Sequence, residues 1–175
     1  WADLDGDARP ELVVAAEWGP VRVFRNQNGR FSDATSALGL SGTTSRWNGL
    51  NAGDFDGDGR LVLVVTSWGR NSQWGASPDR PLALHVGRFG RGGLGLLVAR
   101  RDSVTGREMP LESFARAALS VPSARERITS FADYSRSDVS TVLGLASSRV
   151  VRVRATTFDH LLLLNRGHRF LSPPL

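Results

Sequence analysis

An acidic motif occurs twice in this chain, and each copy is followed at once by an apolar run. The first copy, residues 3–11, reads DLDGDARPE, and the second, residues 54–62, reads DFDGDGRLV. Alternate carboxylates in a glycine-containing loop can supply the oxygen ligands, about six to eight in number, that calcium takes. The β-branched runs that follow are typical of strands. The repeat therefore predicts a loop-then-strand unit stapled by calcium.

The EF-hand also begins with alternating aspartates, but it has glycine at position 6 and a bidentate glutamate at position 12. Position 12 falls here on Val14 and Val65, inside the apolar runs. The ligand set must therefore close at position 9 and lead into a strand. A purely structural alternative, in which Asp and Gly only form turns, is weakened by the second copy in the same context.

The two loops are predicted to differ in affinity, because position 9 is Glu11 in the first loop and Val62 in the second. Without this bidentate acid, the second site should be weaker and should complete its coordination with water. The expected calcium ligands are the carboxylates of Asp3, Asp5, Asp7 and Glu11 with the carbonyl of Arg9, and the carboxylates of Asp54, Asp56 and Asp58 with the carbonyl of Arg60.

A third copy is visible at residues 86–99, where Arg88, Gly90 and Gly92 replace the acids of positions 1, 3 and 5. With one residue deleted, Gly95 falls at position 9. Read alone, this segment could be an RGG-like nucleic-acid segment or a phosphate-binding loop, but no Gly-Lys-Ser/Thr follows it. The repeat favours a turn that has lost its metal.

Composition narrows the class of protein. The 175 residues include no cysteine, which excludes a disulfide-stapled scaffold. Apolar runs such as 161–164 are far shorter than the ~20 residues that span a bilayer, so no transmembrane segment is expected. The chain begins without an initiator Met, so a preceding segment, including any signal peptide, is expected to be missing.

The net charge of +5 comes entirely from arginine on the basic side and raises the possibility of a polyanion partner. Arg152 and Arg154, however, alternate with apolar residues, as on the solvated face of a strand. Nucleic-acid binding is therefore not expected.

The apolar pattern predicts a mainly β chain with one helical insertion at 110–145, where Ser137 and Asp138 are a possible helix start. The insertion is expected to cap a sheet edge or a propeller end. A tight turn is expected at 17–20 and a hairpin at 27–30. Strands are expected at 11–17, 21–26, 61–66, 82–86, 94–100 and 160–165. The expected division is 1–109 for the calcium-loop repeats, 110–145 for the helical insertion and 146–175 for further strands.

These loops, with segments 17–31 and 47–54, resemble FG-GAP/VCBS repeat proteins. Segments 127–144 and 158–170 extend the resemblance to the bacterial branch similar to cartilage acidic protein, with a UnbV-type C-terminal region. The resemblance implies an integrin-α-like β-propeller with calcium loops, in a secreted, periplasmic or cell-surface protein used for adhesion or ligand presentation. It does not identify the protein or glycan ligand.

The expected fold is thus a partial β-propeller with an α-helical insertion. Propellers generally close with four to eight blades, and the chain holds about three repeats. The remaining blades of a longer chain are therefore expected as partners. Val13, Val65 and Leu97 should lack some packing neighbours in this arc.

Two further functional classes have less support in the sequence than this scaffold. An enzyme has little support: His85, His160 and His168 form no H-E-x-x-H motif, and no G-x-S-x-G elbow is present. A carbohydrate-binding module is the alternative, because tryptophans in loop positions offer stacking faces. The candidate stacking residues are Trp18, Trp47, Trp68 and Trp74.

Overall fold

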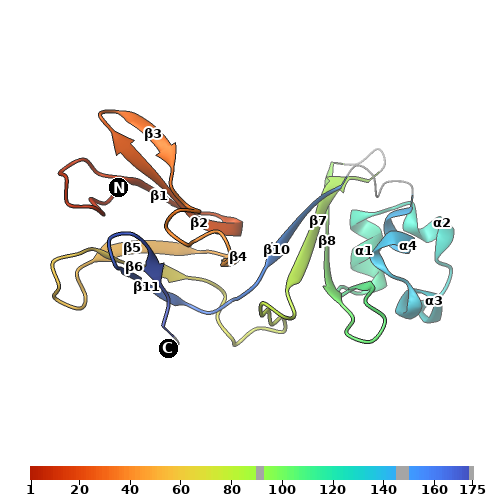
Figure 1. Ribbon diagram of the computed structural model, residues 1–175. Coiled ribbons are helices and arrows are strands. Elements are labelled where there is room, and N and C mark those ends of the chain that lie inside the picture. Colours follow the sequence, from red (N-terminus) through yellow and green to blue (C-terminus); the bar gives the residue numbers. More distant parts are fainter. Residues whose placement is uncertain (90–92, 145–149, 174–175) are drawn as a thin grey trace. The chain divides into compact units, whose positions relative to one another are not determined.

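The computed structural model describes residues 1–89, 93–144 and 150–173 (Figure 1). This part of the chain is mainly β, as expected, and forms three four-stranded sheets. Every strand pair with a described register is antiparallel. The chain divides into two compact units: residues 1–77 with 155–175, and residues 78–154.

The first unit contains two of the sheets. In one, the order is β1-β2-β3, with β4 pairing to the beginning of β2; in the other it is β12-β11-β6-β5. The strands are β1 (Leu12–Ala15), β2 (Glu17–Gln27), β3 (Arg30–Asp33), β4 (Thr44–Arg46), β5 (Gly49–Gly53), β6 (Val62–Thr66), β11 (Leu161–Asn165) and β12 (Phe170–Leu171).

Strands β6 and β11 are neighbours, with Val65 opposite Leu161, although the second unit lies between them in sequence. The chain leaves this sheet after β6 and returns to it at β11. The segment that interrupts the sheet is therefore 78–154. It extends from before β7 (Leu82–Arg88) into β10 (Val151–Ala155) and is longer than the expected helical insertion at 110–145.

The core of the first unit is shared by its two sheets. Val21 and Val23 on β2 pack in one cluster with Leu63 of β6 and Leu163 of β11. Val13 and Val65 belong to the same cluster and are buried. The prediction that they lack packing neighbours is wrong, because the alternating apolar faces of the two sheets bury each other.

The expected tight turn at 17–20 forms the first part of β2 instead. Glu17 and Gly19 pair with β4, and a bulge between them puts Trp18 at a positive φ of 59°. The hairpin at 27–30 is confirmed. Asn28 and Gly29 have φ values of 55° and 84°, as a two-residue type I′ turn requires.

The second unit is a sheet in the order β10-β7-β8-β9 with four helices between β9 and β10. These helices lie within the range 110–145 expected for the insertion. Asp138 caps α4 by accepting a hydrogen bond from the Thr141 amide. The elements are β7 (Leu82–Arg88), β8 (Leu94–Arg101), β9 (Glu108–Pro110), α1 (Phe114–Ser120), α2 (Ala124–Arg127), α3 (Phe131–Arg136), α4 (Val139–Leu143) and β10 (Val151–Ala155).

The helices cover a sheet face, whereas capping of a sheet edge or propeller end was expected. Leu97 and Ala99 of β8 lie in one core cluster with Ala117, Val121 and Val142. Leu97 is fully buried there. The expectation that Leu97 lacks neighbours is therefore also wrong, because the insertion itself supplies them.

Candidate metal centre

Strand pairing places the three motif copies in the same structural position. In each copy, the residue before position 1 is paired with the residue at position 9. These pairs are Ala2 with Glu11, Gly53 with Val62 and Gly87 with Gly95. Each motif thus lies between two segments that pair in antiparallel.

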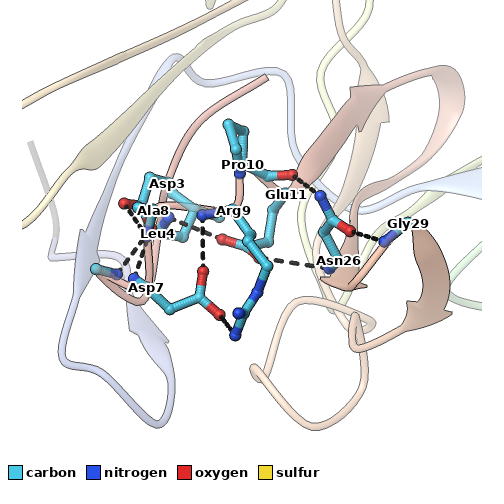
Figure 2. A network of polar contacts seen from close by, with 10 residues as sticks. Asp3, Leu4, Asp7, Ala8, Arg9, Pro10, Glu11, Asn26 and Gly29 are labelled. Atoms are coloured by element: carbon cyan, nitrogen blue, oxygen red, sulfur yellow. Dashed lines mark hydrogen bonds and ion pairs between the residues drawn. The ribbon is translucent and has the colours of Figure 1, made fainter.

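The first loop is organised around the side chain of Asp3. Its Oδ1 accepts hydrogen bonds from the amides of Gly6 and Asp7 at 2.8 and 3.1 Å, and its Oδ2 accepts one from Ala8 at 3.0 Å (Figure 2). These bonds need a left-handed backbone, and Gly6 and Ala8 have φ values of 81° and 64°. The loop is therefore curled around position 1.

Asp7 is bound by Arg9 and is not part of the acidic cluster. Its Oδ1 accepts from the Arg9 amide at 2.8 Å, and its Oδ2 contacts the Arg9 guanidinium at 2.5 Å. The amide hydrogen bond and the ion pair with Arg9 thus occupy both carboxylate oxygens of Asp7. The Asp7 carboxylate is not in the cluster that the other acids of this loop form.

Glu11 is a buried carboxylate with 2% of its surface exposed. Its Oε2 accepts from the Leu4 amide at 2.8 Å and its Oε1 from the Asn26 amide at 3.5 Å, while the Asn26 side chain donates to the Pro10 carbonyl (Figure 2). The acid at position 9 is thus held between the loop and β2.

Oxygen atoms of Asp3, Asp5 and Glu11 converge within 4.8 Å of one another. Among the described residues, no ion pair involves these three acids, and the Asp5 carboxylate has no hydrogen bond. Like charges this close repel one another, and an oxygen-binding cation relieves that repulsion. Three of the expected ligands, Asp3, Asp5 and Glu11, thus lie close enough together to hold one cation.

The second loop repeats this geometry. Asp54 accepts from the amides of Gly57 and Gly59 at 2.8 and 3.1 Å, and Asp58 accepts from the amide of Arg60 at 2.9 Å. These bonds match those of Asp3 and Asp7 position by position. The acids of this loop, Asp54, Asp56 and Asp58, also offer oxygens within 4.8 Å of one another.

The second loop differs from the first in that an arginine contacts the acids of its cluster. Arg166, from the turn after β11, places Nη1 at 3.1 Å from Asp58 Oδ2 and 3.5 Å from Asp56 Oδ2. Position 9 is the buried Val62, which offers no side-chain oxygen. Sequence reasoning missed Arg166 because about 110 residues separate it from Asp56 and no local pattern marks the contact.

The expected metal-free third loop includes residues 90–92, which lie outside the described residues. Its flanks are described: Arg88 ends β7 and Phe89 is buried beneath the helices. Phe55, its counterpart in the second loop, is 59% exposed. The absence of metal from this copy stays a prediction.

The tryptophans expected to stack on sugars are engaged with protein. Trp47 is buried and donates from Nε1 to the Gly19 carbonyl at 2.9 Å. Trp68 contacts Trp74, and Arg46 lies over its ring at 4.4 Å from the centroid. Trp18 packs edge-on against Phe158.

Among the described residues, no histidine belongs to either acidic cluster. In the second unit, His85 Nε2 is 3.0 Å from Glu108, beside a cavity of about 410 Å³. Burial and the Arg152 guanidinium lower the pKa of His85. Arg152 also pairs with both oxygens of Glu108. The Asp159 carboxylate beside His160 is held by Arg70 at 2.7 Å.

Comparison with known proteins agrees with the repeat. A family model for an FG-GAP-like repeat matches residues 3–65, a range that includes both acidic loops. Searches of curated proteins and of solved structures gave no match. No helix in the described ranges has the length and apolar character needed to cross a membrane.

Proposed function

We propose that this chain is a calcium-binding, non-enzymatic β-repeat scaffold and that its first acidic loop is the principal metal site. The observation that carries the proposal is the convergence of Asp3, Asp5 and Glu11 within 4.8 Å. Glu11 is buried and fixed, and Asp5 has no hydrogen bond or ion pair among the described residues. Such a set binds a hard cation at little cost in reorganisation.

The proposed coordination uses oxygens that the loop already positions. Each carboxylate can accept about four contacts, so Asp3 and Glu11 can bind a cation while they keep their amide hydrogen bonds. The carbonyl of Arg9 and water would complete the shell. Asp7 joins only when its carboxylate releases Arg9, so we propose that Asp7 contributes less than Asp5.

A calcium site of this kind is useful where the calcium concentration is near millimolar, which is the case outside the cytosol. Extracellular modules bind calcium with dissociation constants of ~10⁻⁴ to 10⁻³ M. A site of ~10⁻⁴ M at about 1 mM calcium stabilises the fold by ~1.4 kcal/mol. We therefore propose an extracellular, periplasmic or cell-surface location.

The sheets support a blade-like role. Propeller blades are four-stranded antiparallel sheets, and each described sheet has four strands. We propose that further blades complete a propeller that presents a surface to a protein or glycan ligand, as in the FG-GAP/VCBS branch similar to cartilage acidic protein. FG-GAP repeat families are generally non-enzymatic, which favours a scaffold over a catalyst.

The carbohydrate-binding alternative has less support. It needs open indole faces, but Trp47 is buried and Trp68 is covered by Arg46. Nucleic acid is not expected as a partner, since arginines such as Arg152 and Arg107 are paired with acids.

Calorimetric calcium titration of the full chain tests the proposal. The unmodified chain should bind with a dissociation constant of about 10⁻⁴ M, and Asp5→Asn should weaken binding by about tenfold or more because it removes one charged ligand. Asp79→Asn, the same change at an exposed residue outside the loops, should bind as the unmodified chain does. Failure to bind calcium, or equal binding by Asp5→Asn, would refute a metal site in the first loop.

A further inference from the structure

The turn between β11 and β12, residues 165–169, contacts both acidic loops. Asn165 is buried and donates from Nδ2 to the Leu4 carbonyl of the first loop at 2.7 Å. Its Oδ1 accepts from the Gly167 amide at 2.9 Å, and the Arg166 amide donates to the Arg169 carbonyl at 2.9 Å. The backbone that carries Arg166 is therefore fixed on both sides.

From this fixed backbone, Arg166 reaches the second loop. A single nitrogen, Nη1, lies within 3.5 Å of both Asp56 and Asp58. One positive group thus lies between two acids of a loop whose backbone is folded like that of the first loop. A metal ion would occupy a comparable place among these oxygens.

The turn packs against the second loop at another point as well. A Cβ at Gly167 would lie 2.8 Å from Arg60 Nη1, and Gly167 has a φ of 78°. The positive φ favours glycine here, whereas the close atom is the end of an exposed arginine side chain, which can move. The turn therefore approaches the second loop at two points, through Arg166 and beside Gly167.

In the first loop, the arginine that pairs with an acid is Arg9, which binds Asp7 outside the acidic cluster. No ion pair among the described residues involves Asp3, Asp5 or Glu11. The two loops thus share a backbone geometry but differ in charge. The first cluster has an additional acid at position 9, and two acids of the second cluster pair with an arginine.

We propose that Arg166 is a tethered cation that takes the place of calcium in the second loop and thereby restricts metal binding to the first. This inference rests on the proposed function, since it assigns calcium to one of the two loops. The guanidinium does not deprotonate in proteins, and its tether gives it a high effective concentration at the acids. Calcium must displace it, and Val62 offers no ligand in compensation.

Calcium titration of full-length variants tests the inference. The matched pair is Arg166→Gln and Arg169→Gln, which make the same charge change in the same turn. The unmodified chain and Arg169→Gln should each bind one calcium in the ~10⁻⁴ M range, while Arg166→Gln should gain a second ion with affinity at the second loop raised about tenfold. Two equivalent ions in the unmodified chain, or no change in Arg166→Gln, would overturn the inference.

Thermal unfolding in EDTA gives a readout without calcium. Arg166→Gln should lower the melting temperature more than Arg169→Gln, because it leaves Asp54, Asp56 and Asp58 without a cation. This difference should vanish when Asp56→Asn and Asp58→Asn are both present, since the repulsion is then relieved. If no variant binds calcium, the proposed function fails, and the unfolding measurements then test the role of Arg166 by themselves. A smaller effect of Arg166→Gln in the presence of Asp56→Asn and Asp58→Asn supports that role. Additive effects of these substitutions overturn it.

Discussion

The Asn165 side chain donates a hydrogen bond of 2.7 Å to the carbonyl of Leu4. Leu4 is position 2 of the first acidic loop, and Asn165 ends β11, which follows the inserted unit in sequence. The bond is buried and joins the two ends of the first unit. The first loop is therefore held by the strand that returns after the insertion as well as by its neighbours in sequence.

Asn165→Ala should reduce the free energy of unfolding by ~1–3 kcal/mol, because it leaves the buried Leu4 carbonyl without its donor. Urea unfolding of the full chain measures the loss. Asn71→Ala, at an exposed position, should change stability by less than ~0.5 kcal/mol. Equal losses of unfolding free energy in the two variants would show that the hydrogen bond to Leu4 does not stabilise the chain.

Position 6 is alanine in the first loop and glycine in the second, so exchanging the two residue types tests the cost of backbone strain there. Ala8 has a φ of 64°, and Gly59 at the same position has a φ of 80°. Ala8→Gly should stabilise the chain and Gly59→Ala should destabilise it, each by ~0.5–2 kcal/mol, because only glycine adopts this region freely. A Cβ at Gly59 would meet no atom within 4 Å, so steric contact does not contribute. Shifts of the same sign in denaturant midpoint would contradict this account.

Gly95→Ala should disturb the contact between α1 and β8. An added Cβ would lie 2.5 Å from the Ser120 carbonyl oxygen and 2.3 Å from the Phe89 ring. Because a backbone atom cannot yield easily, we expect a loss of ~1–3 kcal/mol in stability. Gly93→Ala is the matched control, since its Cβ would meet nothing within 4 Å. Equal unfolding curves for the two variants would show that α1 does not pack closely on this strand.

The stability of the second unit should fall as the pH drops below about 6.5. Burial lowers the pKa of His85 from its ordinary value of 6.5, so the unfolded chain takes up a proton before the folded chain does. This contribution to stability is complete above pH 6.5 and is lost as the pH falls. Unfolding measured between pH 7.5 and pH 5 should show this slope in the unmodified chain and in His168→Gln, but a reduced slope in His85→Gln. An unchanged slope in His85→Gln would assign the effect to other groups.

Local chemistry made much of the fold predictable. The Asn28-Gly29 pair fixed the first hairpin through its positive φ values, and Asp138 began α4 as an N-cap. The register of the repeat also followed from the sequence, since Gly95, placed at position 9 by one deletion, pairs with Gly87.

Long-range pairing was harder to predict. Nothing near Val65 indicates that it pairs with Leu161 across a whole inserted unit. For the same reason the sequence did not predict the contacts of Arg166, because Asp56 and Asp58 are more than 100 residues away in the chain. The orientation of Asp7 was also not predictable, because the adjacent Arg9 competes for its carboxylate only once the loop has folded.

The most direct test is the crystal structure of the full chain grown with several millimolar calcium, with the ion identified by anomalous scattering. The account predicts an ion at about 2.3–2.6 Å from oxygens of Asp3, Asp5 and Glu11, and Arg166 still between Asp56 and Asp58. A first loop without an ion under these conditions, or an ion bound only in the second loop, would contradict it.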